Sequence, residues 1–287
     1  MRAGFGIVAL LDLSTSRMDA QNKRENVAGR RPDYSQTLTL LANKGVRYST
    51  VIDLGCADGH FFVQHYLQGI FKDSVPVHID ANALYEPSLK SIQTELGGHY
   101  RIAAASDQNG TIELTTSVHP YWSSVRGTDD LYWARINKLS DGAQTVPAIR
   151  LDDLAAEMSL KPPYLLKLDI QGAEVDALKG ARHILNDTHV VICEADLADF
   201  QAINAELTGA GFDLFDVTGL SYTADHWLGW FYPVYLNRKL AHLIDPSFWR
   251  EESSGSVIDV QIKRRKYIVD WLAESLAKIK SERSGRT

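Results

Sequence analysis

Short apolar runs recur along the chain, and most of them end at a small or acidic residue. Runs of this kind are typical of strands that are buried on both faces of a parallel sheet. We predict strands at residues 50–54, 75–80, 100–104, 164–169 and 189–194. Parallel strands place their carboxyl ends at one edge of the sheet, so the residues that end these runs should gather where α/β proteins bind ligands.

Stretches with helical spacing separate these strands, at residues 59–69, 85–96, 173–185 and 199–209. This alternation predicts an α/β fold with a doubly wound, mainly parallel sheet. Two more strand-like runs, 212–217 and 228–236, follow each other without a helix and predict an antiparallel edge hairpin. The pattern therefore predicts a seven-stranded sheet.

Two regions do not follow the alternation. Residues 118–147 are polar and aromatic without a sustained period, and we expect them to form a substrate lid over the ligand-binding edge. Residues 241–287 predict a C-terminal amphipathic helix and a polar tail, with the basic run 263–266 on a solvated helix face. Residues 1–33 then form an N-terminal extension, and the main domain spans 34–240.

Composition narrows the class of protein. The 287 residues are 45% hydrophobic and 23% charged, which suits one large globular domain and argues against disorder. The net charge of -6 disfavours nucleic acid as a partner. Two cysteines, Cys56 and Cys193, are too few for a disulfide framework, and the apolar run at 5–13 is too short to span a membrane. We expect a cytoplasmic protein without a transmembrane segment.

The first predicted strand leads into a glycine-containing turn, Val51 to Phe62 (VIDLGCADGHFF). Gly55 allows a close backbone approach, and Gly59 allows the next helix to pack near the sheet. Ala57 stands where a dinucleotide-binding GxGxxG motif has its middle glycine, so a ligand without a pyrophosphate fits better. The cofactor-binding candidates in this turn are Asp53, Gly55, Cys56, Ala57 and Gly59. A structural turn without a ligand is the alternative.

The next two strand ends carry further cofactor-binding candidates. Asp80, followed by Ala81, can accept hydrogen bonds from both hydroxyls of a ribose, although it could instead cap the following helix, as Asn82 also could, or join a solvated surface. At the third strand end, Ala105, Ser106 and Asp107 could meet an adenine edge, with an ordinary turn as the alternative.

The segment Leu165 to Ala181 (LLKLDIQGAEVDALKGA) resembles the KIDvEGaE…LkGa motif of FkbM-type S-adenosylmethionine-dependent methyltransferases. VIDLGCADGHF resembles a second motif of that family, and the resemblance covers residues 45 to 235. It implies a Rossmann-like class I methyltransferase fold with S-adenosylmethionine as cofactor. Three positions depart from the family pattern: Gln171 replaces a glutamate, Asp80 replaces a glutamate, and His60 stands where the family often has an aromatic residue.

Methyl transfer to an alcohol requires alignment of the nucleophile and removal of a proton. The catalytic candidates are Asp169, which should lie beside the transferring methyl group, and His226 and His60, either of which could also be an ordinary surface histidine. Asp169 and Glu194 end adjacent strands and could together hold Mg²⁺, or Asp169 could simply orient cofactor or substrate.

Trp122 and Trp133, in the predicted lid, are candidates for stacking on the acceptor. The resemblance implies an O-methyltransferase acting on a hydroxyl of a sugar, glycolipid or polyketide-like molecule, so the expected partner is a small-molecule or glycan acceptor. The alternatives are an NAD-dependent oxidoreductase and a non-catalytic binding module on the same fold. A homo-oligomer is also compatible with the sequence.

Overall fold

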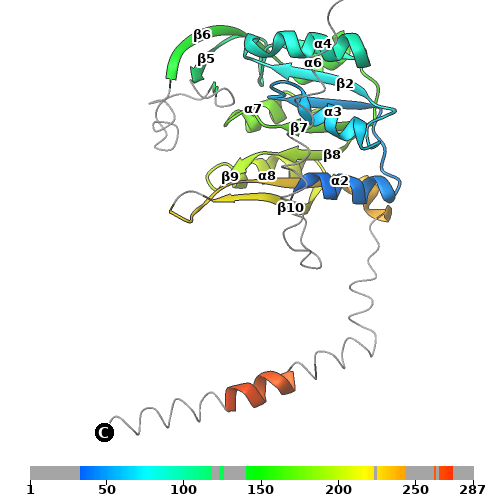
Figure 1. Ribbon diagram of the computed structural model, residues 1–287, viewed down its shortest axis with the longest axis vertical. Coiled ribbons are helices and arrows are strands. Elements are labelled where there is room, and N and C mark those ends of the chain that lie inside the picture. Colours follow the sequence, from blue (N-terminus) through cyan, green and yellow to red (C-terminus); the bar gives the residue numbers. More distant parts are fainter. Residues whose placement is uncertain are drawn as a thin grey trace, which may run out of the picture. The chain divides into compact units, whose positions relative to one another are not determined.

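A computed structural model of the protein describes residues 33–117, 123–125, 140–222, 225–243, 262 and 265–273. The strands of its main sheet are β1 Thr50–Leu54, β2 Val75–Asp80, β3 His99–Ile102, β7 Tyr164–Leu168, β8 Thr188–Cys193, β9 Ala195–Asp196, β10 Phe212–Tyr222 and β11 Leu228–Asn237. Their spatial order within the described residues is β10-β11-β8-β7-β1-β2-β3, with β9 beside β11. In the larger unit of Figure 1, the sheet runs from β10 upward through β8 and β7 to β2.

The sheet is mainly parallel, as predicted. Strands β3, β2, β1, β7 and β8 pair in parallel, whereas β11 is antiparallel to β8, β9 and β10. Each of the seven predicted strands corresponds to one strand of this sheet, and β10 and β11 form the predicted edge hairpin. The short β9 was not predicted, because two residues are too few to show a period.

A second, three-stranded sheet in the order β4-β6-β5 replaces part of the predicted lid. Its strands are β4 Ala104–Ala105, β5 Gly110–Ser117 and β6 Ser140–Ile149. Residues 140–147 therefore continue a hairpin with β5, and Ser124 pairs with Thr115. Trp122, Trp133 and most other residues of the predicted lid lie outside the described residues.

Helices connect the strands. The described helical segments up to residue 243 are α2 Tyr34–Asn43, α3 His60–Leu67, η1 Ala83–Tyr85, α4 Glu86–Leu96, α6 Leu151–Glu157, α7 Glu174–Lys179, η3 Ile184–Asp187, α8 Phe200–Gly209 and η4 Arg238–Leu243, where η marks a 3₁₀ helix. The predicted helix 173–185 is shorter than expected, because α7 ends at Lys179. Helices α2 and α6 were not predicted, and α2 begins where the side chain of Asp33 accepts a hydrogen bond from the Ser35 amide at 2.8 Å.

The two faces of the central strands differ in chemistry. Ile52, Leu54 and Leu166 belong to the apolar core that includes residues of α6, α7 and α8. The alternate side chains of Asp53 and Lys167 point to the opposite face, where the Lys167 ammonium lies 5.5 Å from the ring centroid of Phe61 on α3. The buried charges therefore lie between the sheet and α3.

The chain divides into two compact units, Met1–Arg238 and Lys239–Thr287. The second unit is helical over residues 265–273, within the C-terminal helix that the sequence predicts. Among the described residues, no helix is long and apolar enough to cross a membrane.

Gly55, at the end of β1, has φ +67°, and a Cβ atom there would lie 1.9 Å from the carbonyl oxygen of Asp169. The sequence assigned this glycine to a ligand approach, but the neighbour that demands it is the backbone that follows β7. Gly45 has φ +93°, and a Cβ atom added there would have no neighbour within 4 Å, so it is a matched control for backbone strain alone.

We expect Gly45→Ala to lower the free energy of unfolding by about 1–2 kcal/mol, because an alanine then adopts a left-handed conformation. Gly55→Ala should cost a further ~1–3 kcal/mol or more, because β1 and the end of β7 must also separate. Urea unfolding of both variants measures the difference, and equal losses would contradict the close approach.

Candidate functional site

A cavity of about 340 Å³ opens at the carboxyl ends of the parallel strands, where the sequence predicts a ligand. Residues that end β1, β2, β7 and β8 contribute to it, and side chains of α2, α3 and β11 complete its wall. Its polar and aromatic lining includes Tyr34, His60, Asp80, Lys167, Asp169, Gln171, Glu174, Glu194, Trp230 and Tyr232.

Asp80, at the end of β2, ties the loop after β1 to the neighbouring strand. Its Oδ2 accepts a hydrogen bond from the Ala57 amide at 2.9 Å, and its Oδ1 accepts one from the Asn82 amide at 2.8 Å. Burial raises the pKa of Asp80 to about 6, although both amides favour the ionised form. Each carboxylate oxygen keeps a second acceptor position, so Asp80 can bind donors of a ligand in the cavity.

Lys167 lies between two carboxylates in the centre of the sheet. Its Nζ is 3.2 Å from Asp53 Oδ1 and 3.3 Å from Asp169 Oδ2, and only 6% of its side chain is exposed. Burial alone would lower the pKa of Lys167, but Asp169 and Asp53 outweigh it and raise the pKa well above its ordinary value. The ammonium is therefore charged, and it holds Asp169 at the cavity wall.

Asp169 and Glu194 form a linked carboxyl pair at the ends of β7 and β8. The Gln171 amide nitrogen donates to Asp169 Oδ1 at 3.2 Å and to Glu194 Oε2 at 2.6 Å. The Tyr232 hydroxyl lies 3.1 Å from Asp169 Oδ2 and 3.3 Å from Glu194 Oε1. One amide and one phenol thus bridge the same two groups, the amide from the loop after β7 and the phenol from β11.

The two carboxyl groups differ in ionisation. Burial disfavours the carboxylate of Asp169, but Lys167 and the hydrogen bonds from Glu194 and Tyr232 hold its pKa below the usual range. Burial, followed by the charge of Asp169, raises the pKa of Glu194 well above the usual range. The environment therefore favours the carboxylate form of Asp169 and the protonated form of Glu194.

Glu174, the first residue of α7, shapes the turn that carries Asp169 and Gln171. Its carboxylate accepts hydrogen bonds from the amides of Ile170 at 3.1 Å and Gly172 at 2.9 Å. Gln171 itself has φ +56°, and its carbonyl accepts a hydrogen bond from the Ser124 hydroxyl at 2.7 Å. Burial raises the pKa of Glu174 to about 7. These contacts hold the Gln171 side chain over the carboxyl pair.

The structure brings many of the sequence-predicted residues to the cavity and leaves others away from it. The cavity wall includes Gly55, Ala57, His60, Asp80, Ala81, Ala105 and Asp169. The predicted residues that do not line it are Asp53, Cys56, Gly59, Ser106, Asp107 and His226.

Local structure explains why several of these residues do not line the cavity. Asp53 is 1% exposed because it pairs with Lys167 beneath the cavity. Gly59 faces Ile92 of α4, 2.5 Å from where a Cβ atom would lie. The Ser106 carbonyl lies 2.1 Å from the corresponding position at Gly180, so this turn packs on the end of α7. His226 is exposed, with φ +64°, in the turn before β11.

Sequence reasoning missed Lys167, Tyr232 and Tyr34 as residues of the site. Lys167 was counted within an apolar run, although a lysine in the middle of a buried strand is itself a signal of a buried partner. Tyr34 packs edge-to-face on Tyr232, with ring centroids 5.2 Å apart, and burial raises its pKa to about 12. No signal in the sequence joins these two tyrosines, which lie near opposite ends of the main domain.

The predicted Mg²⁺ site is not supported by the geometry. Within the part of the chain that the structure describes, no group of three or more His, Cys, Asp or Glu side chains is placed to hold a metal ion. Asp169 and Glu194 do lie together, but both already accept hydrogen bonds from Gln171 and Tyr232, Asp169 is paired with the Lys167 cation, and burial raises the pKa of Glu194. A hard cation needs several ionised or carbonyl oxygens.

The family model of the methyltransferase FkbM domain matches residues 42–214 of this chain. This chain belongs to the FkbM methyltransferase family. The resemblance drawn from the two sequence motifs is therefore confirmed. A comparison with curated proteins finds no significant match.

Solved structures similar to this FkbM chain are also methyltransferases. The FkbM methyltransferase from Methylobacillus flagellatus KT shares 18% identity at a TM-score of 0.44, over 71% of this chain and 48% of that one. This chain thus spans about half the length of that relative. A precorrin-6y C5,15-methyltransferase from Geobacter metallireducens shares 8% identity at a TM-score of 0.37, over 70% and 87% of the two chains. A Streptococcus pneumoniae protein in complex with S-adenosyl-L-methionine shares 12% identity at a TM-score of 0.37, over 82% and 94%.

The matched FkbM segment does not contain the whole cavity wall. Tyr34 precedes residue 42, and Trp230 and Tyr232 follow residue 214, yet all three line the cavity. The FkbM segment supplies the strand ends and the carboxyl pair, and the flanking segments supply the aromatic side.

We expect Lys167→Met to lower the free energy of unfolding by about 3–5 kcal/mol, because it leaves two buried carboxylates unpaired. Lys179→Met, which breaks the exposed pair with Asp176, should cost less than about 1 kcal/mol. The double variant Asp53→Asn/Lys167→Met should recover part of the loss. Denaturant unfolding at neutral pH measures all three, and a Lys167 variant as stable as the Lys179 control would contradict the buried ion pairs.

Proposed function

We propose that this chain is an S-adenosylmethionine-dependent O-methyltransferase whose cofactor and acceptor meet in the cavity beside Asp169. The observation that carries the proposal is the position of Asp80 and Asp169 in one cavity of an FkbM methyltransferase domain. Asp80 ends the second strand, where a ribose is held in Rossmann-like folds, and Asp169 ends the central strand.

The residues present fit the cofactor. Asp80 keeps acceptor positions for the two ribose hydroxyls, and Ala57 and Ala105 add small apolar surfaces to the same cavity wall. The described lining has six acidic side chains, among them Asp80 and Asp169, against the one ammonium of Lys167, and this excess favours a cationic ligand. S-adenosylmethionine supplies an activated methyl group on a positively charged sulfur.

Asp169 is the residue proposed to hold the acceptor hydroxyl. Its carboxylate is ionised and fixed by Lys167, Gln171 and Tyr232, so it can accept the hydrogen bond of an alcohol without rearranging. A carboxylate with a lowered pKa is a weak base, so Asp169 orients the hydroxyl and receives its proton only as the new C–O bond forms. His60 lines the same cavity and is the second candidate for this proton.

The acceptor class rests on the family resemblance together with the aromatic wall. Trp230 and Tyr232 present apolar ring surfaces next to polar groups, a combination that suits the faces of a sugar or of a hydroxylated macrocycle. We therefore propose a sugar, glycolipid or polyketide-like acceptor. His226, Trp122 and Trp133 are not used in this proposal.

The two alternative functions make different predictions in the same experiment. Titration calorimetry with S-adenosylmethionine, S-adenosylhomocysteine and NADH should give binding only of the first two. Binding of NADH alone would favour the oxidoreductase, and binding of none would favour a module without a cofactor. Mass spectrometry of cell extracts incubated with methyl-labelled cofactor should then identify the acceptor, and an unlabelled extract despite tight cofactor binding would contradict methyl transfer.

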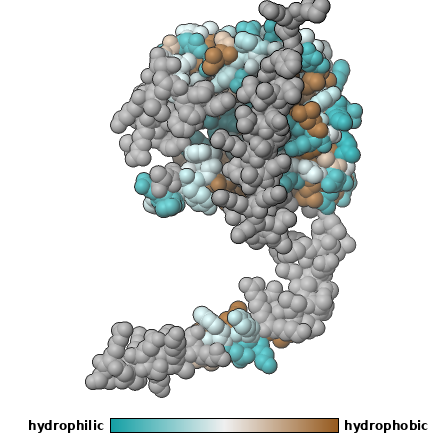
Figure 2. Space-filling view, viewed as in Figure 1, coloured by the Kyte–Doolittle hydropathy of each residue, from teal (hydrophilic) through white to brown (hydrophobic). Residues whose placement is uncertain are grey.

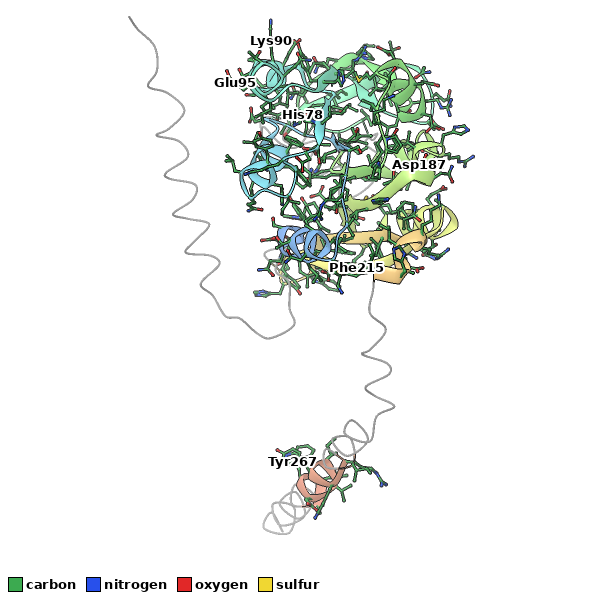
Figure 3. All side chains as sticks on the ribbon, turned by 90° about the vertical axis from the view of Figure 1, so that its right-hand side faces the viewer. His78, Lys90, Glu95, Asp187, Phe215 and Tyr267 are labelled. Carbon is green, nitrogen blue, oxygen red and sulfur yellow. The ribbon has the colours of Figure 1, made fainter. Side chains whose placement is uncertain are left out.

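Asp80→Ala should weaken cofactor binding by about ten- to a hundredfold, because the loss of a charge-assisted hydrogen bond costs ~1.5–3 kcal/mol. Glu95→Ala, on the exposed surface of α4 and labelled in Figure 3, is a control that should leave the affinity unchanged. Because the pKa of Asp80 is about 6, the carboxylate is lost as the pH falls through that value. The parent should therefore lose affinity below about pH 6, whereas the Asp80→Ala variant should not show that step.

Asp169→Asn should reduce the rate of methyl transfer by about 10²-fold or more while cofactor binding is retained, because the amide cannot receive the acceptor proton. Single-turnover rates with labelled cofactor and the identified acceptor measure the effect. Asp176→Asn, on the exposed surface of α7, is the matched control. If His60→Ala lost as much activity and Asp169→Asn almost none, the proton would go to His60 instead.

A further inference from the structure

The helix in the second unit exposes most of its large apolar side chains. The exposed fractions are 47% for Ile268, 53% for Val269, 56% for Trp271 and 47% for Leu272. Every described residue between 265 and 273 is exposed. Figure 2 shows hydrophobic and hydrophilic side chains together on this helix, and Figure 3 labels Tyr267 on it. Surface helices of globular proteins normally bury their apolar side, so this exposure requires an explanation.

The apolar side chains share one side of the helix. Ile268 and Leu272 are four residues apart, and Val269 and Leu272 are three apart, so all three lie together, with Trp271 beside them. Asp270 falls on the opposite side. Arg265 also falls on the apolar side, one turn before Val269, where a long side chain can extend its charge away from an apolar medium.

The charge of this segment is opposite to that of the rest of the chain. Residues 257–287 contain eight lysines and arginines and four acidic residues, which gives a net charge of +4. Because the whole chain has a net charge of -6, residues 1–256 carry -10. Four of the eight basic residues are consecutive in the sequence, Lys263 to Lys266.

We propose that the helix over residues 265–273, together with the basic run that adjoins it in the sequence, is a membrane-surface anchor that lies in the headgroup region of an anionic lipid bilayer. An interfacial helix of this kind inserts its apolar side to the acyl boundary, with tryptophan at the interface and basic residues at the headgroups. Each lysine or arginine near an anionic surface adds attraction that salt weakens. The described helix is short, so apolar insertion and charge must act together.

Three partners could cover this helix: a lipid surface, a second copy of the chain and a nucleic acid. Its charge and its apolar side together favour the lipid surface. A second copy would bring another basic run against this one, and like charges oppose such pairing. A nucleic acid would satisfy the charge but would leave the apolar side exposed. An anionic bilayer satisfies both features of the same helix. The anchor is independent of the methyltransferase proposal, because it concerns residues outside the cavity and is measured without turnover.

The test is co-sedimentation of the full chain with vesicles of phosphatidylcholine alone or mixed with phosphatidylglycerol. We expect binding only to the mixed vesicles, with a loss of about tenfold or more when the salt concentration is raised. Binding to neither vesicle would overturn the proposal. Light scattering on the same samples distinguishes a second copy, because a stable dimer without vesicle binding would show that another chain covers the apolar side.

Two sets of variants separate the contribution of the apolar side chains to vesicle binding from that of the basic residues. Trp271→Ala/Leu272→Ala and the replacement of Lys263 to Lys266 by glutamine should each weaken vesicle binding by about tenfold or more. Tyr222→Ala is the control for the first, because Tyr222 is also 56% exposed but lies on β10. Lys72→Gln/Lys90→Gln, at exposed positions of the larger unit, is the control for the second. Equal losses in the variants and their controls would contradict a site on this helix.

Discussion

The ammonium of Lys167 is the interaction on which the site depends. Lys167 pairs in register with Asp53 on the neighbouring strand β1. Its ammonium contacts the carboxylate of Asp53 and that of Asp169, which follows its own strand β7. A buried cation with two buried carboxylates is stable only as a set, because the removal of one member leaves charges that water cannot reach. The pairing of β1 with β7 and the position of Asp169 are thus parts of one electrostatic arrangement.

The same arrangement gives two neighbouring carboxyl groups different protonation states. Lys167 contacts Asp169 but not Glu194, while Gln171 and Tyr232 contact both. Lys167 is therefore the contact that distinguishes the two carboxyl groups, and it adds to the burial that raises the pKa of Glu194. The cavity wall therefore carries two adjacent carboxyl groups with opposite pKa shifts, each held from more than one element of the fold.

Structural features that depend on a single contiguous segment, such as the end of a strand, can be predicted from the sequence. Asp80 and Asp169 follow apolar runs, so their place at the ligand edge could be predicted from period and termination alone. The pairing of Lys167 with Asp53 depends on which strands are neighbours, which no single segment reveals. Ser106 and Asp107 were expected at the cavity, but the chain leaves the main sheet after Ile102 and enters the second sheet at Ala104. Because β4 has only two residues, the alternation of apolar and polar positions cannot reveal that the chain has changed sheets.

Gly55 has a consequence that extends beyond packing. Because its backbone lies against the Asp169 carbonyl, the loop after β1 and the turn after β7 are in direct contact. A displacement of one segment must move the other, since no side chain separates them. Under the proposed function, a ligand bound at one segment can therefore bias the affinity for a ligand bound at the other, and a thermodynamic cycle would record this as mutual cooperativity.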